Sequence, residues 1–258
     1  MKHKSFLPFL FVAPLLLAGC DGSFGSGGGK AKRKGENIVN VKEWDSVFEP
    51  ENFSMHTNFS HKVVQTVKGK DGKEIERCSE DMQMDSGKIH VIQKYRNIGL
   101  DGEGNIIEIN DDVYTFEIYV NVLKVEDNGD AEYNYYRQQD GKWYEFNNKA
   151  NLEVLYLDLA LFEFPFEEFE YNSTTNSYYS EQYTYKIEHE YHLGLKEIQI
   201  RDCTVKFKDK LPVLYAFDFT SINSDGSENL TAHMDGEFGD YNKIKVELPQ
   251  ADEVVPQS

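Results

Sequence analysis

The chain has 258 residues and a formal net charge of −18, from 27 Lys and Arg against 45 Asp and Glu. This balance argues against nucleic-acid binding, because proteins hold phosphate backbones with clusters of basic residues. It is typical of a highly soluble surface and keeps the body of the protein away from anionic lipid. The length suits one large β domain or two small ones.

The first twenty residues have the pattern of an export signal. Lys2 and Lys4 precede an apolar run over 6–18, and small residues follow before Cys20. A charged start, a short apolar core and small residues before a cleavage point are typical of a secretory signal peptide. The alternative is a transmembrane helix, but the run is shorter than the roughly twenty residues of a span and is interrupted by two prolines.

The residues Leu17, Ala18, Gly19 and Cys20 resemble the lipobox of bacterial lipoproteins, in which an aliphatic residue and two small residues precede a cysteine. The resemblance implies that residues 1–19 are removed and that Cys20 carries a diacylglyceryl group. Such a protein is held at the extracytoplasmic face of the cell membrane, since two acyl chains anchor a protein firmly. Removal of Lys2 and Lys4 shifts the formal charge of the exported chain from −18 to −20.

The lipidated Cys20 and a Gly- and Ser-rich tether make up residues 20–37. This composition predicts a flexible linker. Its four basic residues, Lys30, Lys32, Arg33 and Lys34, lie close to the lipid, where each adds about 1 kcal/mol of attraction to an anionic leaflet. An ordinary polar linker is the alternative and is compatible with this role.

We expect one antiparallel β domain over 38–250 and a disordered tail over 251–258. The domain begins with a short helix within 38–52, around Trp44. From 53 to 67 apolar side chains and His61 take odd positions, and this period of two predicts a strand with one dry face. The same alternation recurs over 89–95, 114–122, 179–187, 213–219, 230–234 and 244–248.

Tight turns separate these runs. A small polar residue followed by glycine, a pair that tolerates positive φ, occurs at 71–72, 86–87, 128–129, 140–141 and 225–226. Connections this short join antiparallel neighbours, so the sequence predicts a meander. At 140–141 a two-residue turn sets Arg137 opposite Tyr144 and Tyr135 opposite Phe146, and such aromatic cross-strand pairs stabilise a sheet.

The segment 150–161 is apolar on almost all sides, which predicts a helix covered on both faces. A meander with one apolar face also needs cover. We therefore expect the sheet to curl into a half-barrel or barrel with this helix on its concave side. The candidate residues of a ligand cavity are Leu152, Leu155, Tyr156 and Leu159 of the helix and Phe116, Ile118, Tyr183, Tyr185 and Phe217 of the strands.

This order of elements, an N-terminal helix, a meander, a central helix and further strands, resembles the lipoprotein-carrier half-barrels of the LolA-like superfamily. The resemblance spans about 38–250 and rests on architecture. It implies a hydrophobic cup that holds acyl chains. It transfers no ligand residue to this chain.

No catalytic or metal-binding pattern is present in the sequence. His189 and His192 are three residues apart in a strand pattern, which puts them on opposite faces, whereas helical zinc ligands are four apart. We therefore expect neither an enzyme nor a cofactor. Cys78 and Cys203 either pair in an oxidising compartment or are two small buried side chains on distant strands.

Two functions remain. The first is binding of a lipid or similar apolar ligand in a β half-barrel cup, with the membrane as partner through the lipid anchor. The second is a surface interaction or structural envelope module with a filled core and no small ligand. The same apolar side chains suit a cup or a core.

Overall fold

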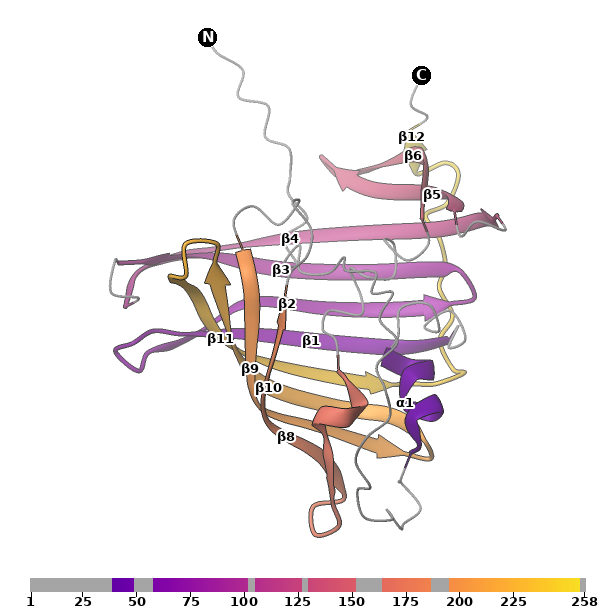
Figure 1. Ribbon diagram of the computed structural model, residues 1–258. Helices are drawn as coiled ribbons and strands as arrows, with labels where there is room; N and C mark the ends of the chain where they lie inside the picture. Colours follow the sequence, from indigo (N-terminus) through magenta and orange to yellow (C-terminus); the bar gives the residue numbers. More distant parts are fainter. Residues whose placement is uncertain are drawn as a thin grey trace.

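The computed structural model describes residues 39–48, 58–101, 105–126, 130–151, 164–186 and 195–255. Most of them belong to one open, curled β-sheet (Figure 1). In chain order, the helices and strands are α1 (Val41–Phe48), β1 (Asn58–Lys68), β2 (Glu74–Asp85), β3 (Lys88–Leu100), β4 (Ile106–Val125), β5 (Asp130–Gln139), β6 (Lys142–Asn151), the 3-10 turn η1 (Phe166–Glu168), β7 (Glu170–Asn172), β8 (Ser177–Lys186), β9 (Leu195–Lys208), β10 (Leu211–Asn223), β11 (Glu228–Gly239) and β12 (Val254–Val255).

The sheet consists of two meanders joined edge to edge. Its strand order is β12-β6-β5-β4-β3-β2-β1-β11-β10-β9-β8-β7, so the first and last long strands of the chain, β1 and β11, pair in the middle. All pairs are antiparallel except β12 with β6. The mainly β class and the curled single sheet are confirmed, and the centre of the sheet is closed by a pairing between residues far apart in sequence.

The cross-strand register collects apolar side chains on one side of the sheet, which we call the apolar face. One row crosses six strands, through Phe59, Met84, Ile89, Val120, Tyr135 and Phe146. The first four of these side chains are buried, as expected for one dry face of a sheet. His61 lies on the same face, as its odd position in the alternation predicts.

The short helix predicted within 38–52 is present as α1. Asn40 and Glu43 cap each other: the Glu43 N–H donates to Asn40 Oδ1 (3.1 Å) and the Asn40 N–H donates to Glu43 Oε2 (2.9 Å). This reciprocal arrangement satisfies two donors at the helix start. Glu43 also forms an ion pair with Lys210 of the β9–β10 turn, which ties the helix to the sheet.

The hairpin predicted at 140–141 has the expected register, with Arg137 opposite Tyr144 and Tyr135 opposite Phe146. Its two turn residues have φ of 51° and 74°. Both angles lie in the left-handed region that a two-residue hairpin turn requires.

Three sequence predictions need correction. The first two residues of the helix expected at 150–161 belong to β6, and the remainder lies outside the described residues. The segment 244–248 is not a strand, because it runs beside the end of the sheet and the Ile244 N–H donates to the Asn58 side chain. The expected disordered tail contributes β12, which pairs with β6.

In the part of the chain that the structure covers, no helix has the length and apolar character needed to cross a membrane.

Candidate functional site

The predicted cavity residues fall into two separate groups. Tyr183 of β8 and Phe217 of β10 are buried in one core cluster, whereas Ile118 of β4 packs against another. Phe116, also on β4, is half-buried. At least four strands lie between the two groups in the sheet, and their members pack in different core clusters.

The other candidates give no further test of the cavity. Leu152, Leu155, Tyr156 and Leu159 lie outside the described residues, as do Cys20 and the two histidines at 189 and 192. The backbone of Tyr185 is part of β8 and pairs with that of Ile198.

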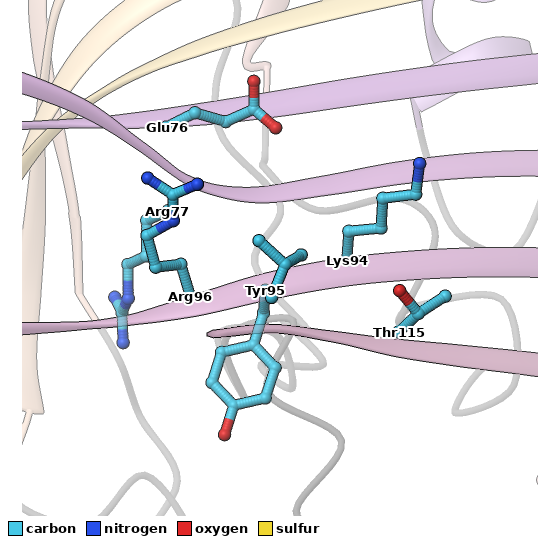
Figure 2. Close-up of a pocket in the computed structure, with 7 residues that line it drawn as sticks. Glu76, Arg77, Lys94, Tyr95, Arg96 and Thr115 are labelled. Atoms are coloured by element: carbon cyan, nitrogen blue, oxygen red, sulfur yellow. The ribbon is translucent and has the colours of Figure 1, made fainter. Parts of the chain in front are cut away.

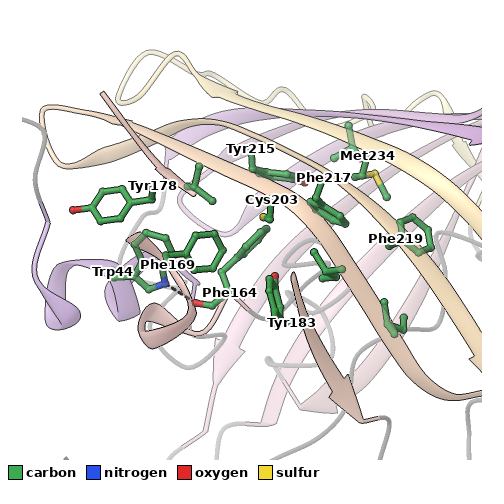
Figure 3. Close-up of a cluster of buried hydrophobic side chains, with 14 of the residues drawn as sticks. Trp44, Phe164, Phe169, Tyr178, Tyr183, Cys203, Tyr215, Phe217, Phe219 and Met234 are labelled. Atoms are coloured by element: carbon green, nitrogen blue, oxygen red, sulfur yellow. Dashed lines mark hydrogen bonds between the residues drawn. The ribbon is translucent and has the colours of Figure 1, made fainter. Parts of the chain in front are cut away.

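Trp44 is the centre of a filled core over β8 to β11. Its side chain is 1% exposed, and its indole N–H donates to the carbonyl oxygen of Phe164 at 2.6 Å (Figure 3). The rings of Phe169 and Tyr178 lie 5.0 and 5.1 Å from the Trp44 ring. The Tyr178 hydroxyl in turn accepts the Val39 N–H at 2.8 Å, so α1 and the η1 segment are fastened onto this half of the apolar face.

The other half of the apolar face also buries a core cluster on β1 to β4, and it becomes more open toward β5 and β6. Five side chains of β4, β5 and β6 are only half-buried; we call them the aromatic surface, and they are Phe116, Ile118, Tyr133, Tyr135 and Phe146. Tyr135 and Phe146 are cross-strand partners with ring centres 6.2 Å apart. Burial raises the pKa of the Tyr135 hydroxyl, so this ring stays neutral at physiological pH.

A buried polar pair separates the filled core from the aromatic surface. His61 of β1 is 1% exposed, its Nε2 lies 3.1 Å from the Tyr215 hydroxyl, and its ring stacks on Phe238 at 4.2 Å. Burial lowers the pKa of His61 to about 3 and raises that of Tyr215 far above its usual range. Both side chains are therefore neutral near pH 7. Neither has a pKa close to 7, which is the range that suits general acid–base catalysis.

Gly236 makes this pair possible. It lies between the two residues on β11, and a Cβ built there would be 2.0 Å from Cζ of Tyr215. The Tyr215 ring therefore crosses β11 over the glycine to reach β1. Sequence patterns did not reveal this site; the one signal for it is a glycine inside an alternating strand, which often marks a close approach.

A second polar contact lies beside it on the apolar face. The Gln93 side-chain amide donates to Glu80 at 2.6 Å, and Glu80 is 4% exposed. Glu80 pairs in register with Val63 and Gln93, so it occupies a position that the alternation reserves for apolar side chains. A buried carboxylate needs such donors, because an unpaired charge in the interior is costly.

The two cysteines that remain after Cys20 are free and do not form a disulfide. Cys78 lies on β2 and Cys203 on β9, with three strands between them. Burial raises the pKa of Cys78 to about 11 and raises that of Cys203 further. Neither thiol is thus activated as a nucleophile near neutral pH, since the thiolate is the reactive form.

No protein-family model and no curated protein matches this chain. Among solved structures, the chain is similar to the S-type phycobiliprotein lyase CPES from Guillardia theta. The identity is 10%, the alignment covers 78% of this chain and 98% of that one, and the TM-score is 0.28.

Proposed function

We propose that this protein is a membrane-anchored, extracytoplasmic lipoprotein that binds an apolar ligand, such as an acyl chain of a lipid, on its aromatic surface. The observation that carries the proposal is the contrast between the two halves of the apolar face. Trp44 and its neighbours fill one half. On the other half, Phe116, Tyr135 and Phe146 keep part of their surface accessible.

The chemistry of the aromatic surface suits a chain-like apolar ligand. Exposed apolar area is costly in water, and covering it contributes about 25 cal/mol per Å². The tyrosines add rings that are apolar in the body and carry a polar hydroxyl group. A sheet also presents these side chains on a rigid frame, so the ligand does not have to order them.

Binding of a fluorescent fatty acid tests this proposal. Replacing Phe116 or Phe146 with Ser should weaken binding about tenfold or more, because each change removes apolar contact area worth more than ~1.4 kcal/mol. Asn147→Ser is the matched control, since Asn147 neighbours Phe146 on the opposite face of β6 and is exposed. Equal affinity for all three variants would refute the assignment of the site.

The anchor is tested separately by fractionation of cells that express a Cys20→Ser variant. The variant should leave the membrane fraction, because the proposed diacylglyceryl group has no other attachment point. Its retention in the membrane would contradict the anchor while leaving ligand binding open to its own test.

A structural or interaction module is the second candidate. It is favoured by the completeness of the filled core, in which Phe169, Ile198, Ile200, Val205 and Phe217 are all 0% exposed. Under this alternative the aromatic surface would contact a protein, and tyrosine-rich surfaces are common in interfaces. Absence of any bound lipid in the isolated protein would support it.

A further inference from the structure

A basic hollow lies on the polar face of the sheet, the side opposite the apolar face. It has a volume of about 380 Å³ and is lined by Glu76 and Arg77 of β2, Lys94, Tyr95 and Arg96 of β3, and Val113 and Thr115 of β4 (Figure 2). Figure 2 shows Lys94 and Tyr95 leaving β3 on opposite sides, as successive residues of a strand do. Lys94 pairs with Thr115, which places both on the polar face.

Two irregularities of the sheet form the hollow. The β1–β2 register shifts at Gln65, which leaves Arg77 as the extra residue of a bulge, and the β3–β4 register shifts after Arg96. Bulges bend a strand and redirect its side chains. Arg77 and Arg96, on neighbouring strands, lie at these irregularities and both line the hollow.

The charge of the hollow is opposite to that of the protein. Three cations face one carboxylate, that of Glu76, in a chain whose formal net charge is −18. Elsewhere in the described part of the chain, lysines such as Lys62, Lys68 and Lys149 are paired with carboxylates at 2.9–3.4 Å. A local excess of positive charge is therefore unusual in this molecule.

The side-chain contacts of the two arginines differ from those of these lysines. Among the described residues neither Arg77 nor Arg96 forms an ion pair or a side-chain hydrogen bond, and Nε of Arg96 is buried without an acceptor. Burial lowers the pKa of the Arg77 guanidinium, which reflects the loss of water around this cation. Buried donors with no acceptor are rare in folded proteins, and a bound anion is one of the ways in which such donors are satisfied.

We propose that this hollow is a binding site for a phosphomonoester group. Three cations against one carboxylate leave a formal charge that matches the charge of about −2 on such a group. Arginine binds phosphate through two parallel N–H donors, and lysine adds a point charge. The Thr115 hydroxyl provides a further donor at the rim of the hollow.

This site is independent of the proposed lipid-binding function, because the aromatic surface lies on β4, β5 and β6 on the other face of the sheet, and only β4 is shared with the hollow. The phosphomonoester can belong to a soluble metabolite or to a lipid headgroup. Isothermal titration of the full-length protein with glycerol 3-phosphate and with inorganic phosphate tests the first source. Cosedimentation with phosphatidylcholine vesicles, with and without phosphatidic acid, tests the second.

We expect saturable binding in at least one of these two arms, weakened by salt as charge–charge contacts are. Arg96→Gln and Arg77→Gln should each weaken it about tenfold or more, because each removes a charge-assisted contact. Lys62→Gln is the matched control: it removes one positive charge from the polar face of β1, and it should leave the affinity unchanged. Arg77→Lys keeps the charge and should retain part of the binding, even if Arg77→Gln fails to fold.

Three results would overturn the proposal. The first is absence of binding by the wild-type protein in both arms. The second is an equal loss of affinity in Lys62→Gln and Arg96→Gln, which would show an effect of net charge alone. The third is binding to vesicles that depends on phosphatidic acid but is unchanged in Arg96→Gln, since this would place the phosphate contact on another surface.

Discussion

Gly236→Ala is predicted to destabilise the protein strongly, although the backbone at this position is ordinary for a strand. The new methyl carbon would lie 2.0 Å from Cζ of Tyr215 and 2.3 Å from its Cε1. Tyr215 is 3% exposed and is packed among other core side chains, so its ring cannot move aside freely. The ring must therefore leave β11, and its hydroxyl must leave Nε2 of His61.

The size of this destabilisation follows from two unfavourable terms and one favourable term. Overpacking a close-packed core costs about 1–3 kcal/mol. Leaving a buried polar group such as the His61 ring without its partner costs about 1–3 kcal/mol more. Against these, replacing glycine with alanine in a strand contributes about 0.5–1 kcal/mol. The expected net loss in the free energy of unfolding is about 1–5 kcal/mol, from these three terms together.

Urea denaturation of Gly236→Ala and of a matched control, Gly239→Ala, measures this difference. Gly239 is on the same strand, but a Cβ there would meet only Ser60 Oγ, at 3.4 Å. The control should keep or raise the stability, by up to about 1 kcal/mol, because it gains the same contribution from alanine without the clash. Equal stability of the two variants would refute the crossing of Tyr215 over Gly236.

Three further predictions concern other parts of the fold. Because the pKa of His61 is about 3 in the folded state and 6.5 ordinarily, the unfolded chain binds an extra proton between these pH values. The free energy of unfolding should thus be retained above pH 6.5 and fall by about 1.4 kcal/mol per pH unit below it. When the free energy of unfolding is measured against pH, His61→Gln should lack this part of the decrease. Gly141→Val should cost about 1–2 kcal/mol in a thermal melt, since its φ is +74°, while Lys142→Val should not. Trp44→Ala should cost about 3–5 kcal/mol, whereas Trp44→Phe, which loses mainly the bond to Phe164, should cost less; equal losses would contradict a role for ring packing.

Local sequence signals predicted the parts of the fold that depend on neighbours in the chain. The turn at 140–141 fixed the register of the β5–β6 hairpin, because a two-residue turn leaves one way to pair its strands. The alternation from 53 to 67 likewise placed His61 on the dry face of β1.

Two long strands escaped this reasoning for identifiable physical reasons. In β9 the buried side chains change from even to odd positions, from Ile200 to Cys203, because the register shifts beside Asp202, whose φ is +51°. In β2 the apolar face carries Cys78 and Glu80, so its alternation is not one of apolar and polar residues.

The candidate sites depended on contacts that no local pattern contains. His61 and Tyr215 are separated by 154 positions and meet only because β1 pairs with β11. The basic hollow similarly combines residues of three strands at two bulges. Sequence alternation identified Phe116 and Ile118 as inward-facing, but it could not tell which half of the face is filled by α1 and η1.

Native mass spectrometry of a secreted Cys20→Ser variant tests the central claim most directly, because this protein carries no covalent lipid that would obscure a bound one. The proposed function predicts additional masses of one or more co-purified lipids, which disappear when Phe116 and Phe146 are both replaced with Ser. A single mass equal to that of the polypeptide, in a variant that unfolds cooperatively and does not bind added fatty acid, would contradict the ligand-binding function and leave a structural module with a filled core.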